Sequence, residues 1–100
     1  MSKKNSSVHY NEYLDLDKIL DAQTPLSKAG NNEAHEEMLF IIIHQTYELW
    51  FKQIIRELSE VRNILCQEQV PEKDIPRAVE RLGRTTEIFK LMATQWSVME

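Results

Sequence analysis

The chain has 100 residues, of which 42% are hydrophobic and 28% charged, and its formal net charge is -4. A chain of this length buries roughly 65% of the surface that its unfolded form exposes, which is enough for one modest core. The surplus of carboxylates argues against nucleic acid or an anionic membrane surface as a partner. No stretch reaches the roughly 18 apolar residues of a membrane span. With two glycines and three prolines, little room remains for a sheet with tight turns.

The amino-terminal part of the sequence predicts a tail, a short helix and a loop. Residues 1–8 are polar, and we expect a disordered tail there. Residues 10–23, YNEYLDLDKILDAQ, carry Leu14, Leu16, Ile19 and Leu20 and predict a short helix. Residues 24–32, TPLSKAGNN, contain a proline, a glycine and two asparagines, which are typical of a loop.

A long helix over about 33–69 is the dominant predicted element. This segment contains no glycine or proline, Asn31 or Asn32 is available as a cap, and glutamates fill the first turns. At 1.5 Å per residue the helix would run on the order of 55 Å. Its apolar positions repeat at intervals of three and four: Phe40, Ile43, Tyr47, Trp50, Ile54, Leu58, Val61 and Leu65.

A third helix follows the segment VPEKDIP, residues 70–76, with Asp74 as its predicted cap. The predicted fold is therefore all-α, with antiparallel helices and one long central helix. The third helix shows no stop signal, and the long helix is apolar on more than one face. We therefore expect further chain or other subunits to cover Leu39, Ile42 and Leu49. The predicted apolar stripe of the third helix is Ile75, Val79, Leu82, Thr86, Phe89, Ala93 and Trp96.

The apolar run MLFIII, residues 38–43, ends on a histidine, and this raises a functional question. At about 100° per residue, Phe40, His44 and Tyr47 fall within roughly 60° of one another on a helix. This face either lines a pocket for an aromatic ligand, with the imidazole as its polar group, or forms a core stripe that tolerates one histidine. The spacing alone leaves both interpretations open.

The sequence predicts no metal site made only of these side chains. His44 and Glu48 are four residues apart, and His35 precedes two glutamates. Neither the Glu-x-x-His pairs of di-iron bundles nor a His-Glu-x-x-His motif is present. Nucleophile triads, glycine-rich phosphate loops and zinc spacings are also absent.

The single cysteine and the amino terminus bear on the compartment. Cys66 cannot form an internal disulfide, so we expect a reducing cytoplasm, and its helical surroundings predict a structural rather than a reactive thiol. The first ten residues carry lysines but no apolar stretch behind them, so a signal peptide is not expected.

Three segments carry a resemblance to a known family. AHEEMLFIIIHQTYELWFKQIIRELSEVR, residues 34–62, resembles the first long helix of the tryptophan 2,3-dioxygenase family. YNEYLDLDKILDAQTPLS, residues 10–27, resembles the segment before that helix, and QWSVME, residues 95–100, resembles a point where the family's chain continues. The resemblance implies a cytoplasmic haem enzyme, a homotetramer of helical subunits. It also implies insertion of O2 across the C2–C3 bond of L-tryptophan, giving N-formylkynurenine.

The resemblance implies site residues as well. By motif, His44 would lie on the distal side of the haem and hydrogen-bond the indole N–H, which we interpret as an orienting role. Phe40 would pack on the bound indole. Tyr10 and Tyr13, with Leu14 beside them, would reach the active site of an adjacent subunit, although ordinary packing also explains this aromatic edge.

Other family residues have no counterpart among these 100. The proximal haem-ligand histidine and the groups that hold the substrate's carboxylate and ammonium would lie beyond residue 100. We therefore expect 9–100 to be the amino-terminal helical segment of a haem dioxygenase domain that continues further, and we expect no turnover from residues 1–100 alone. The alternative is a non-catalytic helical module that oligomerises or binds a ligand.

Overall fold

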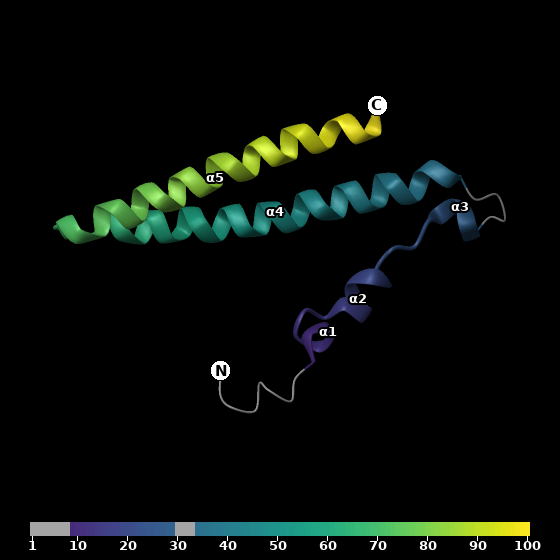
Figure 1. Ribbon diagram of the computed structural model, residues 1–100, viewed down its shortest axis with the longest axis horizontal. Coiled ribbons are helices and arrows are strands. Elements are labelled where there is room, and N and C mark those ends of the chain that lie inside the picture. Colours follow the sequence, from purple (N-terminus) through teal and green to yellow (C-terminus); the bar gives the residue numbers. More distant parts are fainter. Residues whose placement is uncertain (1–8, 30–33) are drawn as a thin grey trace. The chain divides into compact units, whose positions relative to one another are not determined.

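A computed structural model describes residues 9–29 and 34–100, so the predicted tail 1–8 and the predicted caps Asn31 and Asn32 lie outside the described residues. Every helix or strand element assigned in these two ranges is a helix, which confirms the all-α class (Figure 1). The chain divides into two units, Met1–Met38 and Leu39–Glu100, each with its own internal contacts. None of the described helices is long and apolar enough to cross a membrane.

The first unit holds short helices. The prediction of one helix over 10–23 is wrong, because α1 (Tyr10–Tyr13) and α2 (Leu16–Leu20) are separate helices. Asp15 between them has φ 55, in the left-handed region, which a continuous right-handed helix does not contain. Aspartate tolerates this conformation better than most residues. No residue of α1 or α2 is buried, so neither helix has a core of its own.

The predicted loop over 24–32 contains a helix, α3 (Leu26–Ala29), so this prediction is wrong over these four residues, while residues 24 and 25 lie outside any helix. The carboxylate of Glu37 accepts the backbone N–H groups of Leu26 and Ser27, both at 3.0 Å, and the Ser27 hydroxyl. The hydroxyl oxygen of Ser27 in turn accepts the N–H of Ala34 at 2.9 Å. The hydroxyl and then the N–H of Ser27 hold the pKa of Glu37 below its ordinary value.

The long helix is confirmed as α4 (His35–Leu65), although it is shorter at both ends than predicted. Its 31 residues give a length of about 46 Å. Two glutamates lie in its first turn and Arg62 in its last turn, the arrangement that the helix dipole favours. Cys66 follows the helix and is exposed.

The third helix is α5 (Ile75–Gln95), between the 3-10 helices η2 (Glu72–Asp74) and η3 (Trp96–Met99). Asp74 occupies the predicted cap position but makes no capping hydrogen bond from its side chain. Its carboxylate instead lies 3.9 Å from Nη1 of Arg77. The position was therefore predicted correctly and the interaction was not.

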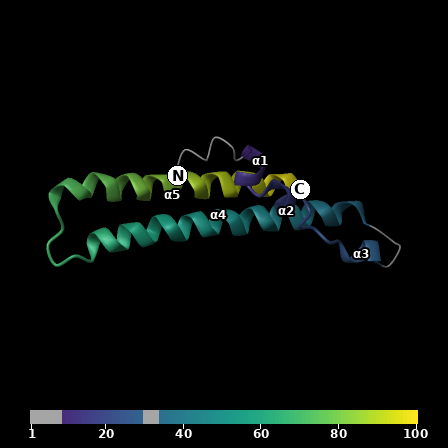
Figure 2. The ribbon, with the colours of Figure 1, turned by 90° about the horizontal axis from the view of Figure 1, so that it is seen from below.

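Helices α4 and α5 lie side by side and antiparallel in the second unit (Figures 1 and 2). Two apolar clusters form along their interface. One contains Ile54, Ile88 and Met92, with Tyr47 and Trp50 packed against it. The other contains Val61, Ile64 and Ala78, with Val70 packed against it.

The predicted stripe of the long helix is partly right, since Ile43, Ile54 and Val61 are buried while Phe40, Leu58 and Leu65 are exposed. The predicted stripe of the third helix is wrong, because all seven positions are exposed. The buried positions of α5 are Ala78, Thr85, Ile88 and Met92. This buried face includes the polar residue Thr85. The hydrophobic pattern of the sequence therefore predicts an adjacent face of the helix as the packing face.

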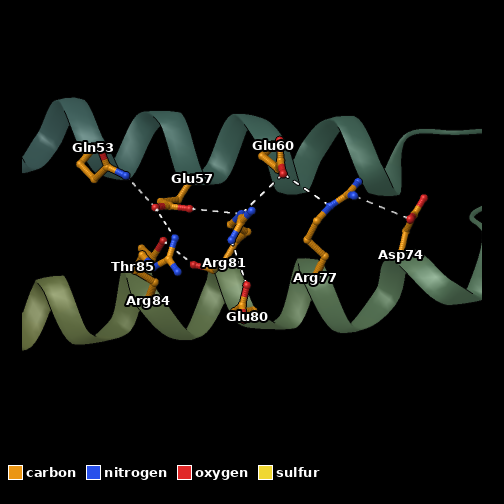
Figure 3. A network of polar contacts seen from close by, with 9 residues as sticks. All are labelled: Gln53, Glu57, Glu60, Asp74, Arg77, Glu80, Arg81, Arg84 and Thr85. Carbon is orange, nitrogen blue, oxygen red and sulfur yellow. Dashed lines mark hydrogen bonds and ion pairs between the residues drawn. The ribbon is translucent and has the colours of Figure 1, made fainter. Parts of the chain in front are cut away.

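A buried carboxylate of α4 bonds to side chains of both helices at the interface between α4 and α5. Glu57 is 4% exposed and accepts hydrogen bonds from Nε2 of Gln53 at 2.7 Å and Nη1 of Arg84 at 3.2 Å. Nε of Arg81 lies 3.6 Å from its other oxygen (Figure 3). Burial raises the pKa of Glu57, but these hydrogen bonds and the two guanidinium charges outweigh it and hold the pKa below its ordinary value. Glu57 is therefore ionised in the interface.

Candidate functional site

His44 and Phe40 lie on an exposed face of α4. The side chain of His44 is 64% exposed, and Phe40 is 56% exposed. Their ring centroids are 6.4 Å apart, with the planes tilted by 37°. The interpretation of His44 as a core residue of the helix pair is therefore wrong, and the interpretation of this face as open to a ligand remains.

A carboxylate on the same helix faces the imidazole. Oε2 of Glu48 lies 3.4 Å from Nε2 of His44, one turn further along α4. A carboxylate only accepts hydrogen bonds, so this contact favours a proton on the facing nitrogen. No group of three or more His, Cys, Asp or Glu side chains that could hold a metal ion is found within 9–29 and 34–100.

The exposed face continues as a row of rings. Tyr47 stacks with Phe51 at a centroid distance of 6.4 Å, and Trp96 lies 6.2 Å from Tyr47. The hydroxyl of Tyr47 donates to the carbonyl of Met92 at 2.8 Å, which ties this turn of α4 to α5. We call the four rings at helical spacing on α4 the aromatic row: Phe40, His44, Tyr47 and Phe51.

Two of these rings were missed by the reasoning from sequence. Phe51 lies four residues after Tyr47 and eleven after Phe40, so its place on the same face follows from the helical repeat. Trp96 comes from η3, and no local signal places it against Tyr47. Spacing therefore identifies Phe51, which lies on the same helix, but not Trp96, which packs beside the row from another element.

The other predicted site residues belong to the first unit. Tyr10 and Tyr13 are 73% and 65% exposed, and Leu14 is partly buried at the end of α1. The backbone N–H of His9 donates to the Glu12 carboxylate at 3.2 Å, which closes this short helix. The structure thus groups the predicted site residues in two sets, one on α1 and its end and one on α4.

Comparison with known proteins agrees with the resemblance. The sequence model of the family described as tryptophan 2,3-dioxygenase matches residues 1–100. The tryptophan 2,3-dioxygenase of Alteromonas mediterranea is 48% identical over 100 residues, which are 100% of this chain and 28% of that protein. That of Dictyostelium discoideum is 52% identical over 93 residues, 93% of this chain and 23% of the relative.

Tryptophan 2,3-dioxygenase B of Danio rerio is 47% identical over 92 residues, 91% of this chain and 23% of the relative. The chain thus spans between 23% and 28% of the length of these three relatives. Because the family match covers every residue and the relatives cover nearly all of them, the chain belongs to the tryptophan 2,3-dioxygenase family.

Proposed function

We propose that these residues serve a haem-dependent tryptophan 2,3-dioxygenase, which inserts O2 into the C2–C3 bond of L-tryptophan to give N-formylkynurenine. The observation that carries this proposal is the aromatic row, three of whose four rings are exposed and one of which is an imidazole, on a chain of this family. A flat apolar substrate requires an apolar surface with a few placed polar groups that fix its orientation. The row supplies both.

The residues present fit the haem that the family implies. Phe40 and His44 offer an open ring surface against which a flat macrocycle can lie, and no other chain segment of the second unit buries them. We assign these two residues to the distal side and place the proximal ligand outside residues 1–100. When bound, the haem supplies the oxygen chemistry.

In this proposal His44 orients the substrate. A nitrogen of the neutral ring accepts the indole N–H, while Phe40 packs on the indole plane. The contact with Glu48 restricts the imidazole, and the anchoring of Tyr47 on Met92 holds the next turn of the helix. Fixing an aromatic substrate in one orientation is a positioning contribution to the rate.

The first unit contributes to the site of a neighbouring subunit in the same proposal. Tyr10 and Tyr13 are the most exposed of the Phe, Tyr and Trp side chains among the described residues, and tyrosine gives a large contact area at a low cost in conformational entropy. Together with Leu14 they would cover the bound substrate in a cytoplasmic homotetramer. Residues 9–100 form a helical segment of the haem domain, and residues 1–100 by themselves are proposed not to turn over tryptophan.

Replacement of His44 tests the proposal in the holoenzyme. We expect His44→Ala to lower kcat/KM for L-tryptophan by about 10- to 100-fold, the effect of losing one orienting hydrogen bond. N-formylkynurenine formation measures this. His35→Ala is the matched control, since that imidazole is almost fully exposed on the first turn of α4.

A substrate analogue isolates the hydrogen bond itself. A tryptophan methylated on the indole nitrogen has no N–H to donate, so its disadvantage relative to tryptophan should shrink in His44→Ala. Unchanged turnover and unchanged KM for tryptophan in this variant would contradict the orienting role.

The exposed apolar side chains on both long helices support the alternative, a non-catalytic helical module. Leu49, Ile55, Val79 and Leu91 are each more than half exposed. The haem content of the purified protein separates the two functions. Stoichiometric haem together with N-formylkynurenine formation supports the enzyme, while oligomers without haem or turnover would support the module.

A further inference from the structure

A polar pocket of about 580 Å³ lies on the flank of the α4–α5 pair, apart from the aromatic row. Four cationic side chains line it, Lys52 and Arg56 from α4 and Arg81 and Arg84 from α5, together with the carboxylates of Glu57 and Glu60. Two positive charges are therefore in excess, in a chain whose formal net charge is -4. We call this feature the basic pocket.

A buried carboxylate holds the two arginines of α5 in the basic pocket. Arg84 uses Nη1 for Glu57, and Arg81 directs Nε toward both Glu57 and Glu60 (Figure 3). The side chain of Arg84 is 49% exposed, so the remaining N–H groups of its fork are open to a ligand. Glu57 thus orients two guanidinium groups while they neutralise its charge.

The two cations that α4 contributes to the basic pocket have no carboxylate partner among the described residues. Lys52 and Arg56 lie one turn apart, and neither forms an ion pair with any residue in the ranges 9–29 and 34–100. Glu60, the other carboxylate of the pocket, is already engaged by Arg77 and Arg81, each at 3.5 Å. The excess positive charge is therefore concentrated at Lys52 and Arg56.

We propose that the basic pocket is a binding site for a phosphate group, held between Lys52 and Arg56 on one side and Arg84 on the other. Two excess positive charges match a phosphate dianion, and a guanidinium fork fits tetrahedral oxyanions. The pocket volume lies within the range of small-molecule sites. Since the ligand bridges both helices, it stabilises their pairing. This site is independent of the proposed dioxygenase activity.

Titration of the protein with inorganic phosphate, at constant ionic strength maintained with chloride, tests the site. We expect a saturable binding heat in calorimetry and a rise of Tm above that in chloride alone. The double substitution Lys52→Ala with Arg56→Ala removes two exposed side chains, so the helices should still pair. We expect this variant to bind phosphate at least tenfold more weakly. Arg62→Ala, which removes an exposed arginine of α4 outside the pocket, should bind as the unaltered protein does.

The source of the phosphate is resolved by a second titration with ADP. Equal affinity for ADP and inorganic phosphate identifies free phosphate as the ligand, and a tenfold tighter binding of ADP identifies a phosphate ester, so both outcomes support the site. The proposal is overturned if phosphate produces no saturable heat, if chloride at equal ionic strength gives the same Tm, or if the double variant binds phosphate unchanged.

Discussion

Glu37 and Glu57 both lie on α4, but each forms polar contacts in a different unit of the molecule. Glu37, in the first unit, accepts two backbone N–H groups and a hydroxyl from the start of α3. Glu57, in the second unit, accepts from Gln53 and Arg84 at the interface with α5. Both pKa values are lowered, but Glu57 is buried, at 4% exposed, whereas Glu37 is only partly buried. Since an unpaired charge costs more at a buried position than at the surface, we expect more of the fold to depend on Glu57 than on Glu37.

Removal of the Glu57 carboxylate should have the largest effect. Glu57→Ala leaves Arg81 and Arg84 without their shared partner at a buried position, and we expect a loss of about 1–3 kcal/mol in the free energy of unfolding. Chemical denaturation followed by helical circular dichroism measures it. Glu87→Ala, which removes an exposed carboxylate paired with Lys90, should change the free energy by less than about 0.5 kcal/mol. Equal losses of unfolding free energy in the two variants would contradict the expectation that the buried carboxylate contributes more than an exposed one.

The sequence predicts the elements that depend on local pattern. Helix α4 follows from a long segment without glycine or proline and from its apolar repeat. Spacing also places Phe40, His44 and Tyr47 on one face, but it does not predict that His44 is exposed. The packing face of α5 does not, because Thr85 and the partners of Glu57 place polar groups on it. Glu57, whose carboxylate makes a polar packing face favourable, lies 27 positions before Arg84. A local sequence pattern does not reach that far.

The first unit shows the same limit. The break between α1 and α2 depends on the left-handed backbone of Asp15, which no hydrophobic pattern predicts. The helix α3 depends on Glu37, eleven residues after Leu26. Proline and glycine are typical of a loop, but they do not reveal that a distant carboxylate supplies an acceptor for the first N–H groups of a helix.

Acid should weaken the second unit by an intermediate amount. A carboxyl whose pKa is lowered by folding contributes stability above its unfolded pKa and loses it as the pH falls through the folded pKa. The free energy of unfolding should therefore fall as the pH drops below about 4.5, the ordinary range for glutamate. Glu57→Gln, which cannot ionise, should lose less between pH 6 and pH 3 than the unaltered protein. An identical acid loss in both would mean that other carboxyls account for it.

Removal of the Ser27 hydroxyl should have the smallest effect on overall stability, because Glu37 and its partners lie at the surface. Ser27→Ala removes the hydroxyl that donates to Glu37 and accepts from Ala34, but leaves the N–H groups of Leu26 and Ser27 for the carboxylate. We therefore expect the pKa of Glu37 to rise toward its ordinary value, measured by NMR titration of its carboxyl carbon. Hydrogen exchange should speed up at Ala34 and remain unchanged at Ile54 and Ile88. If the exchange of Ile54 or Ile88 also increased, the interface of α4 and α5 would depend on the first unit, and the two carboxylates would not hold separate parts of the molecule.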